Sequence, residues 1–347
     1  MGDARHLRRT FELASLHHTH PNPRVGAVVV DRSGSVIGEG AHLGAGHPHA
    51  EVVALGEAGA RAAGSTLYVS LEPCSHHGLT PPCVEAIATA GVARVVVGAI
   101  DPDQRVFGSG VSRLRAEGIE VVTGLLEAEA EDVDPSYFRH RRTGLPRVTL
   151  KLAMTLDGSI AAADGSSQWI TSEEARHDTH LLRSSMDAVV VGAGTLRLDD
   201  PILDVRLEEP VAHQPVPVIV AGRGDLPSES RVWERSPIVI ATRELSIPTG
   251  DLVVVTEGRE HPDPEEAARA LADRGLLDLL LEGGARLAGS WWKTGVVGRC
   301  VFYVAGRVAG GRGIAPLEGE FTTMAQSRAV TVRDVRMVGP DVRVEFE

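Results

Sequence analysis

The stretch that decides the fold runs from His49-Ala50-Glu51 through Glu72-Pro73-Cys74 to Cys83. Zinc prefers nitrogen and sulfur ligands, and a catalytic zinc site keeps three protein ligands and leaves the fourth position to water. His49, Cys74 and Cys83 supply that number of ligands, and Glu51 remains free to move protons. The stretch therefore predicts a catalytic zinc site inside an α/β domain.

The same residues indicate a type of reaction. Bound zinc lowers the pKa of water to about 7, so that hydroxide is available at neutral pH. One imidazole, one carboxylate and two thiols follow one another in the order that zinc-dependent nucleobase deaminases use. We therefore expect an exocyclic amine on an electron-poor ring to be replaced by oxygen.

Two simpler interpretations compete with this one. Cys74 and Cys83 could form a disulfide, or the site could hold a purely structural zinc ion. Against the disulfide, the Pro73-Cys74 step follows the apolar run at residues 67–71, which predicts a strand that ends where a helix starts, and a helix N-terminus stabilises a thiolate. Against a structural zinc, three ligands leave an open position with Glu51 beside it. We therefore favour catalytic zinc.

Composition limits the class of protein. A chain of 347 residues is long enough for two domains. Three cysteines are too few for a disulfide scaffold, and we expect Cys300 to be a small core residue. The N-terminus lacks the apolar segment of a secretory signal, and no apolar run approaches the ~20 residues of a membrane helix. These features predict a cytoplasmic protein without a membrane segment.

The net charge of −12 argues against a nucleic-acid groove, which needs a basic surface. It leaves room for a local basic pocket that binds one phosphate group. The acidic surface is otherwise expected to be solvated and to aid solubility.

Hydrophobic periodicity and turn residues divide the chain into two α/β patterns. In the first, we expect helices at residues 3–18, 49–63, 81–90 and 111–117, and strands at residues 25–30, 35–40, 66–71, 94–100 and 119–122. This order suggests a three-layer α/β/α sandwich with a mixed sheet. Basic residues 139–142 and the turn-like residues 143–146 read as a solvated linker, so the expected domains are 1–146 and 147–347.

The second pattern is also α/β. Strands are expected at residues 147–152, 188–192, 216–220, 238–241, 252–255, 277–281 and 301–304, and helices at residues 172–184 and 264–274. The tail after residue 314 reads as strand and loop. Gly283-Gly284 follows a strand and precedes a helix start, where free amide groups can bind phosphate. A glycine pair can equally be a tight turn, and it lacks the G-x-G-x-x-G spacing of a dinucleotide fingerprint.

Two other segments of the second half favour ligand binding. Residues 151–172 and 192–206 place small residues, hydroxyl groups and scattered cations in loops at strand ends. This composition suits a phosphorylated substrate beside a dinucleotide. Trp169 could stack on a ring, although an isolated tryptophan is more often a core residue.

With these segments in view, nearly the whole chain resembles the bifunctional riboflavin-biosynthesis proteins, in which a pyrimidine deaminase is joined to a pyrimidine reductase. In the first half the resemblance rests on the motifs at residues 20–26, 49–52 and 71–83. The long interval between Cys74 and Cys83 is typical of this family, whereas tRNA-editing and cytidine deaminases have a short Cys-x-x-Cys. In the second half it rests on residues 151–152, 156–158, 167–171, 199–201 and 282–284.

The resemblance implies two successive reactions. The first hydrolyses the 2-amino group of 2,5-diamino-6-ribosylamino-4(3H)-pyrimidinone 5′-phosphate, and the second uses NADPH to reduce the ribosyl chain to ribityl, giving 5-amino-6-ribitylamino-uracil 5′-phosphate. It also implies a cytidine-deaminase-like fold for the first domain and a dihydrofolate-reductase-like fold for the second. The expected cofactors are Zn²⁺ and NADPH, and the expected assembly is a homo-oligomer, either a dimer or a tetramer.

The family roles map onto matching positions of this sequence. In the deaminase, His49, Cys74 and Cys83 would hold zinc, Glu51 would shuttle protons, and Asn22 and His42 would contact the pyrimidine. The expected NADPH-site residues are Ala153, Trp169, Thr195, Asp199, Gly284, Ala285, Arg286, Leu287, Ala288, Gly289 and Ser290. The expected substrate residues of the reductase are Lys151, Ser167, Arg183, Leu203, Arg206 and Glu282.

The sequence departs from the family pattern at three places. Leu79 stands where the family usually has Lys or Arg, which puts one phosphate contact in doubt. Asp103-Gln104 replaces the usual Asn-Pro. Ala221-Gly222 replaces an Asp-Ser type pair that often helps hold the cofactor, so adenosine-phosphate contacts are in doubt there.

Two rival functions stay open at this point. The C-terminal half could be a regulatory module that binds nucleotide without catalysis, and NADPH consumption separates this from a reductase. The first domain could act on bases within a nucleic acid, although the acidic charge and the long cysteine interval oppose this, and an RNA-binding assay would decide.

Overall fold

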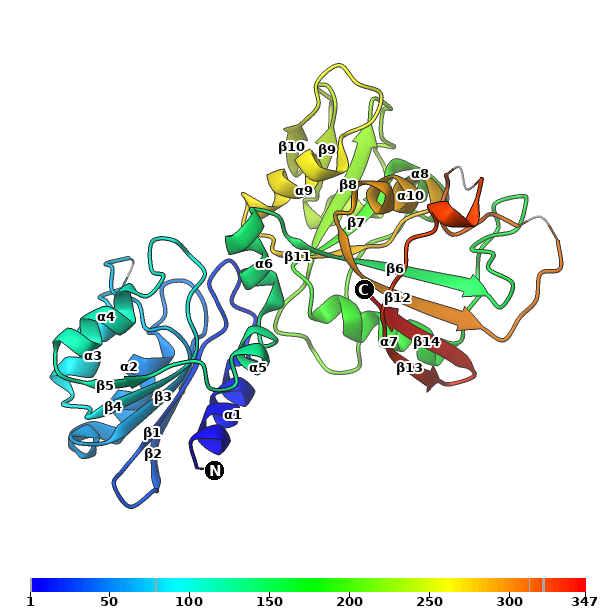
Figure 1. Cartoon of the computed structure of the whole chain (residues 1–347). Helices are drawn as coiled ribbons and strands as arrows, with labels where there is room; N and C mark the ends of the chain where they lie inside the picture. The colour runs from blue at the N-terminus through cyan, green and yellow to red at the C-terminus, as the bar shows by residue number, and fades with distance from the viewer. Residues whose placement is uncertain (1, 79, 312, 320–321) are drawn as a thin grey trace. The chain divides into compact units, whose positions relative to one another are not determined.

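The computed structural model describes residues 2–78, 80–311, 313–319 and 322–347. The chain forms two compact units, Met1–Gly144 and Leu145–Glu347, which are described separately below (Figure 1). The boundary expected from the sequence falls two residues after this division. Among the residues that the structure describes, none of the helices combines the length and apolar character of a membrane-spanning segment.

The first unit is built on a five-stranded sheet in the order β2-β1-β3-β4-β5. The strands are β1 (Gly26–Val30), β2 (Val36–Ala41), β3 (Thr66–Leu71), β4 (Arg94–Ala99) and β5 (Glu120–Val122). β1 runs antiparallel to both β2 and β3, whereas β3, β4 and β5 are parallel to one another. The predicted mixed sheet is therefore confirmed.

Helices cover both faces of this sheet (Figure 1). On one face lie α2 (Ala50–Ala58), α3 (Cys83–Thr89) and α4 (Ser109–Ala116), whose apolar side chains share one core cluster with alternate residues of the strands. On the other face lie α1 (Gly2–Ala14) and α5 (Glu127–Glu131), since a Cβ on Gly98 of β4 would touch Phe11 and Ala130. A Cβ on Gly26 would lie 2.1 Å from the backbone oxygen of Thr10, so glycine lets α1 pack directly on β1. The three-layer prediction is confirmed.

The prediction of a linker at residues 139–142 is wrong. These residues belong to helix α6 (Pro135–Thr143), which begins with proline at its first position and whose N-cap residue, Asp134, accepts a hydrogen bond from the backbone N–H of Tyr137. Tyr137 and Phe138 are buried, and Arg142 lies over the Phe138 ring while pairing with Glu131. The basic residues thus form the outer side of a packed helix.

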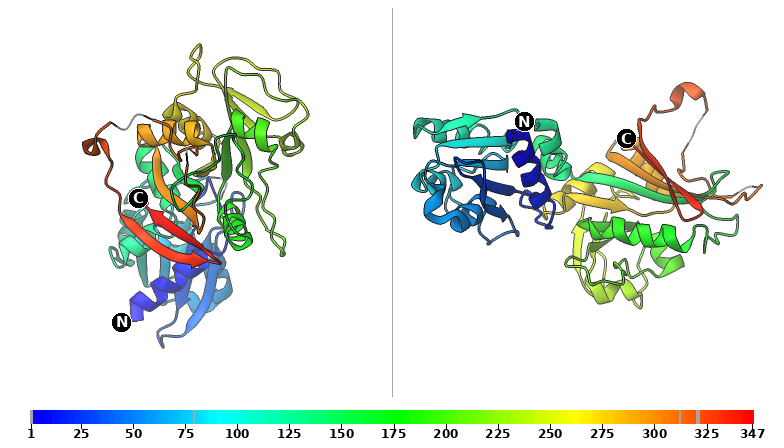
Figure 2. Two further views of the ribbon diagram at one scale, coloured as in Figure 1. Left: turned by 90° about the vertical axis from the view of Figure 1, so that its right-hand side faces the viewer. Right: turned by 90° about the horizontal axis from the view of Figure 1, so that it is seen from below.

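The second unit is built on a nine-stranded sheet in the order β10-β9-β8-β7-β11-β6-β12-β14-β13. All neighbours from β10 to β12 are parallel, and β14 and β13 add an antiparallel hairpin at one edge, drawn in red in Figure 2. The strands are β6 (Arg147–Thr155), β7 (Ala188–Gly192), β8 (Val216–Gly222), β9 (Ile238–Ala241), β10 (Asp251–Val254), β11 (Asp278–Leu281), β12 (Val297–Ala305), β13 (Val332–Val338) and β14 (Asp341–Phe346).

Helices cover both faces of this sheet as well. α9 (Pro264–Ala272) and α10 (Ala285–Thr294) pack on one face, in the cluster that also contains the buried Cys300. α7 (Glu173–Ser184) and α8 (Ala193–Asp199) contribute to a separate cluster on the other face. The expected α/β order and the core position of Cys300 are confirmed. Residues 193–199 are helical and not the loop that the sequence suggested, because α8 starts directly after β7 and packs Leu196 into the core.

Candidate active sites

The three expected zinc ligands lie together in the first unit. Cys74 follows the end of β3, Cys83 is the first residue of α3, and His49 is the N-cap residue of α2. The Nδ1 atom of His49 lies 3.0 Å from the Cys83 Sγ and 3.5 Å from the Cys74 Sγ. The three ligand atoms all lie within 4.8 Å of one another, which is the proximity that one shared metal ion requires.

The chemistry of this donor set fits zinc. Both thiols are free in the structure. Hydrogen bonds from Cys83 and His49 lower the pKa of Cys74 to about 4, and the backbone N–H of Cys83 also points to the Cys74 sulfur at 3.3 Å. Hydrogen bonding to Cys74 and burial raise the pKa of Cys83. A thiolate, a second sulfur and an imidazole nitrogen are the ligands that zinc prefers.

Glu51 is the second residue of α2, two positions after His49, and its side chain hydrogen-bonds with Cys83 of the ligand set. Its side chain is only 3 % exposed, and burial, together with the nearby charge of Cys74, raises the pKa of its carboxyl group. A carboxyl group whose pKa is raised toward neutrality can both accept and return a proton. The environment of Glu51 therefore suits a proton shuttle.

Asn22 and His42, the expected pyrimidine contacts, lie beside the ligand set. The Asn22 Nδ2 lies 3.0 Å from the His42 Nε2, and the His42 Nδ1 lies 3.2 Å from the backbone oxygen of Pro48. The His42 ring meets the His49 ring edge-on at 5.2 Å. Since Nδ1 donates to Pro48, the Nε2 atom of His42 accepts from Asn22, and burial lowers the pKa of His42, which favours this neutral form.

Sequence reasoning assigned no role to two residues near this site. The Thr80 Oγ1 lies 3.1 Å from the Nε2 atom of His49. Glu72 is buried, and its carboxylate accepts hydrogen bonds from the backbone N–H groups of Asp101, Gly108 and Val111, which ties the start of α4 to the segment that carries Cys74. Both residues belong to the quoted motif, but the motif does not say what they bind. Leu79, the expected departure from the family pattern, lies outside the described residues.

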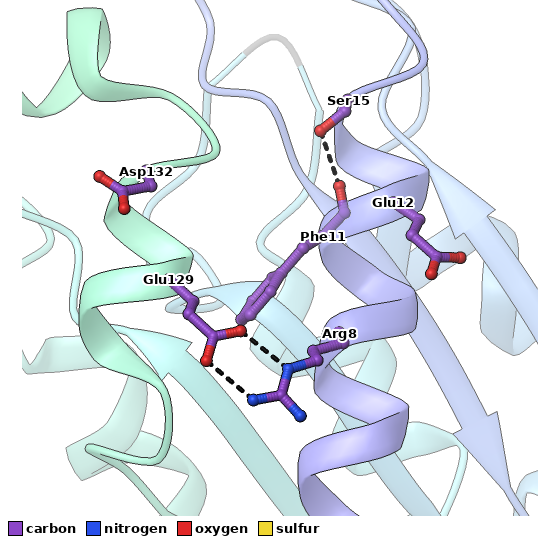
Figure 3. A pocket seen from close by; sticks show the side chains of 6 residues that line it. All are labelled: Arg8, Phe11, Glu12, Ser15, Glu129 and Asp132. Atoms are coloured by element: carbon purple, nitrogen blue, oxygen red, sulfur yellow. Dashed lines mark hydrogen bonds and ion pairs between the residues drawn. The ribbon is translucent and has the colours of Figure 1, made fainter. Parts of the chain in front are cut away.

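A shallow hollow elsewhere on the first unit is shown in Figure 3. It has a volume of about 560 Å³ and lies between α1 and α5, where Arg8 pairs with Glu129 and Phe11 forms the apolar wall. Glu12 and Asp132 add further negative charge. None of the expected site residues lines this hollow, so it does not compete with the His49 cluster as a reaction site.

In the second unit, three expected substrate residues form a charged cluster. Arg183 of α7 holds Glu282, the residue after β11, through two hydrogen bonds: Nε to Oε1 at 2.6 Å and Nη2 to Oε2 at 3.0 Å. Although burial alone would raise the pKa of Glu282, the cations Arg183 and Lys151 lower it to about 2. Burial lowers the pKa of Lys151, a residue of β6 whose Nζ lies 5.6 Å from the centre of the Tyr303 ring.

The loop after α8 contacts this cluster through Arg183. Arg183 also donates to the backbone oxygen of Asp204 at 3.0 Å, and Arg235 donates to that of Leu203 at 2.7 Å. Leu203 is buried with a positive φ of 62°, a conformation that these two bonds help to hold. The backbone N–H of Arg206 donates to the Nδ1 atom of His180, a residue that sequence reasoning missed because it lies 26 positions away. Ser167 lies in the separate loop between β6 and α7.

The expected NADPH residues gather at the carboxyl ends of parallel strands, where α/β sheets bind ligands. β7 and β11 are neighbouring strands, and each leads into a helix. Gly192 is the N-cap residue of α8 and Gly284 is the N-cap residue of α10, and at both helix starts no side chain of the N-cap residue bonds the backbone amides. Thr195 and Asp199 lie in α8, and residues 285–290 form the first turns of α10. Leu287 would touch a Cβ on Gly192 at 3.7 Å, so the two helix starts lie against each other. Ala153 lies in β6.

Trp169 is not a core residue. Its side chain is 60 % exposed, and the Arg176 guanidinium lies 4.6 Å from its ring centre. Trp169, Arg176 and Arg307 line a hollow of about 350 Å³ at the end of β12. An exposed indole beside two cations suits a bound aromatic or anionic group.

The other two departures from the family pattern, at Asp103-Gln104 and at Ala221-Gly222, have local structural reasons. Hydrogen bonds from Arg105 lower the pKa of Asp103 to about 2, and Arg141 lies 3.5 Å away, so a carboxylate at position 103 is neutralised. Gly222 has a φ of 64°, and a Cβ there would lie 2.9 Å from the backbone oxygen of Glu260. The bulge at the end of β8 therefore requires glycine.

Comparison with known proteins identifies both units. The family described as RibD C-terminal domain matches residues 146–344, and the family described as cytidine and deoxycytidylate deaminase zinc-binding region matches residues 2–99. The riboflavin biosynthesis protein RibD of Aquifex aeolicus is 38% identical over 355 residues, which cover 99% of this chain and 98% of that protein. RibD of Mycobacterium tuberculosis is 42% identical over 330 residues, which cover 93% of this chain and 90% of that protein.

Solved structures agree over the full length. Acinetobacter baumannii RibD has a TM-score of 0.91 at 36% identity and covers 99% of this chain and 98% of its own. A Thermotoga maritima protein described as a diaminohydroxyphosphoribosylaminopyrimidine deaminase/5-amino-6-(5-phosphoribosylamino)uracil reductase has a TM-score of 0.89 at 34% identity, with the same coverage. The chain therefore belongs to the RibD family and is a bifunctional riboflavin-biosynthesis enzyme that joins a zinc-dependent deaminase to an NADPH-dependent reductase.

Proposed function

We propose that unit Met1–Gly144 hydrolyses the 2-amino group of 2,5-diamino-6-ribosylamino-4(3H)-pyrimidinone 5′-phosphate, and that unit Leu145–Glu347 then reduces the ribosyl chain to ribityl. The similarity to the Thermotoga maritima protein, named for both reactions, supports the substrates. The observation that carries the deaminase assignment is the cluster of His49, Cys74 and Cys83 with the buried Glu51 beside it.

In the deaminase, His49, Cys74 and Cys83 hold zinc, which when bound supplies a water molecule of lowered pKa. The Glu51 carboxyl would accept one proton from that water and pass it to a ring nitrogen as the water oxygen bonds to C2. It would then take the second proton from the new hydroxyl and pass it to the amino group, whose bond to C2 breaks so that ammonia leaves. Asn22 and His42 orient the pyrimidine, because their paired side chains lie next to the His49 ring. The buried position of Glu51 keeps bulk water from exchanging the proton.

In the reductase, NADPH supplies the hydride when it is bound. The amide groups at the starts of α8 and α10 would hold its phosphates, and the exposed Trp169 would pack against one of its rings. Lys151, Arg183 and Glu282 would hold the opened sugar and orient its C1′ for reduction. Because Arg183 keeps Glu282 ionised, Lys151 is the group of this cluster that can donate a proton.

A combined assay tests both assignments. Purified protein is given the aminated substrate and NADPH, and ammonia release and NADPH absorbance are followed together. We expect ammonia first and NADPH oxidation only after deamination. Glu51→Gln should retain zinc and release no ammonia, yet should oxidise NADPH when the deaminated compound is added. Full ammonia release by this variant would remove Glu51 from the mechanism, and equal NADPH oxidation with the aminated compound would contradict the order.

We also propose a homo-oligomer, a dimer or a tetramer, in the cytoplasm. Val335 and Met337 on the edge strand β13 are 60 % and 63 % exposed, so a second copy of the chain would bury apolar surface there. Free zinc-binding thiols favour a reducing compartment. Light scattering should give a multiple of 36.8 kDa that falls in a Val335→Glu, Met337→Glu variant; a monomer at micromolar concentration would refute the assembly.

A further inference from the structure

The interval between the two cysteine ligands is longer than coordination requires. Eight residues separate Cys74 from Cys83, and the last three of them are Thr80-Pro81-Pro82. A Cys-x-x-Cys spacing already places two sulfurs on one zinc ion. The additional residues of the interval therefore call for another physical explanation.

The end of this interval contacts both nitrogens of one imidazole. Cys83 lies 3.0 Å from the Nδ1 atom of His49, and the Thr80 Oγ1 lies 3.1 Å from its Nε2 atom. Two residues only three positions apart thus reach the ring from its two sides. Pro81 and Pro82 fix the backbone between them, and Pro82 is also the N-cap residue of α3, which starts at Cys83.

The two contacts have different chemical roles. Zinc binds through the nitrogen that faces the sulfurs, so Nδ1 must offer a lone pair and the ring proton must sit on Nε2. That N–H needs an acceptor in a partly buried place. The neighbouring His42 is occupied by Asn22 and Pro48, whereas the Thr80 hydroxyl has a lone pair within hydrogen-bond distance.

We propose that Thr80 is a positioning residue of the deaminase: its hydroxyl accepts the Nε2–H of His49 and thereby fixes the tautomer and the ring orientation that present Nδ1 to zinc. The inference rests on the zinc ligands proposed above. It also explains the long interval between the cysteines, because residues 80–83 carry both the Thr80 hydroxyl and the Cys83 sulfur on one segment that Pro81 and Pro82 make rigid.

Zinc affinity tests this proposal without relying on turnover. The zinc dissociation constant of full-length protein is measured by competition with a chromophoric chelator for the wild type, Thr80→Val, Thr80→Ala and Thr80→Ser. Loss of such a partner typically weakens metal binding 10- to 100-fold. We expect this loss for the valine and alanine variants and near-wild-type affinity for serine, which keeps the hydroxyl. Ser112→Ala is the matched control, since its exposed hydroxyl donates to the backbone oxygen of Gly108, the N-cap residue of α4.

Cobalt provides a second readout. In Co²⁺-substituted protein, we expect Thr80→Val to alter the visible ligand-field bands while the serine variant keeps the wild-type spectrum. Circular-dichroism melts report whether each variant is folded, because NADPH oxidation arises in the second unit and does not monitor the unit that carries Thr80. If valine, alanine and serine all bind zinc like the wild type, or if serine is as weak as valine, the role of the hydroxyl is overturned. If His49→Ala also binds zinc like the wild type, the zinc assignment itself fails, which is a distinct result.

Discussion

The buried pair of Arg183 and Glu282 allows a quantitative prediction. Their side chains are only 14 % and 12 % exposed, and two hydrogen bonds join them. The pKa of Glu282 lies at about 2 instead of 4.5. Since one pKa unit corresponds to about 1.4 kcal/mol, the folded environment stabilises the ionised carboxylate by about 3 kcal/mol. Glu282→Gln should remove this contribution and leave the cations Arg183 and Lys151 without their buried counter-charge.

The expected loss is about 3 kcal/mol, at the lower end of what breaking a buried ion pair costs. For a unit of the size of Leu145–Glu347 this corresponds to a fall in Tm of roughly 6 to 12 °C. The sign of the pH dependence follows from the lowered pKa. The stabilisation is complete above pH 4.5 and disappears as the pH falls through about 2, so the difference between wild type and variant should be constant from pH 8 to 5.

Tryptophan fluorescence during urea unfolding measures this change selectively, because all four tryptophans, Trp169, Trp233, Trp291 and Trp292, lie in the second unit. The matched control is Glu265→Gln, which breaks the half-exposed pair with Arg269 on α9 and should cost no more than about 0.5 kcal/mol. Adding Arg183→Met to Glu282→Gln should recover part of the loss, since no buried cation is then unpaired at that position. A loss for Glu282→Gln below about 1 kcal/mol, or equal to that of the control, would refute the reasoning.

Three further predictions concern the site and its supports. Gly110→Ala should destabilise the first unit by about 1 to 3 kcal/mol and weaken zinc retention, because the new Cβ would lie 2.0 Å from the backbone oxygen of Pro73. Circular-dichroism melts and zinc analysis measure these two effects. Ser112→Ala on the same helix should change neither the melting temperature nor zinc retention. Ser172→Ala should cost the second unit about 1 kcal/mol by urea unfolding, since the Ser172 hydroxyl caps α7 by accepting from the backbone N–H of Ala175; an unchanged midpoint would show that the cap contributes nothing. Removal of zinc with a chelator should stop ammonia release and leave NADPH oxidation of the deaminated substrate intact, because the ligands all lie in the first unit; parallel loss of both activities would contradict this.

The sequence predicted the framework of the deaminase site. The order of one imidazole, one carboxylate and two thiols predicted that His49, Cys74 and Cys83 share one metal ion. In the structure, Cys74 follows β3, Cys83 begins α3 and His49 precedes α2. The strands and helices were predicted because buried runs and turn residues mark most of them.

What the sequence did not reveal depends on contacts between distant side chains. Glu282 and Arg183 are 99 positions apart, and only the fold shows that they pair. The basic residues of α6 were interpreted as a linker because a run of charges is typical of solvated segments. The interpretation did not take into account that Tyr137 and Phe138 are buried and that Asp134 caps the helix. Thr80 stood in the motif, but its bond to His49 becomes visible only when the chain has folded.

The zinc centre is the claim on which both the deaminase mechanism and the role of Thr80 depend. X-ray absorption at the zinc edge of the purified, zinc-loaded protein tests it most directly. We predict one zinc per chain with two sulfur neighbours at about 2.3 Å and one nitrogen at about 2.0–2.1 Å, and loss of one sulfur in Cys83→Ser. A zinc ion without sulfur neighbours, or a spectrum that Cys83→Ser leaves unchanged, would contradict the account.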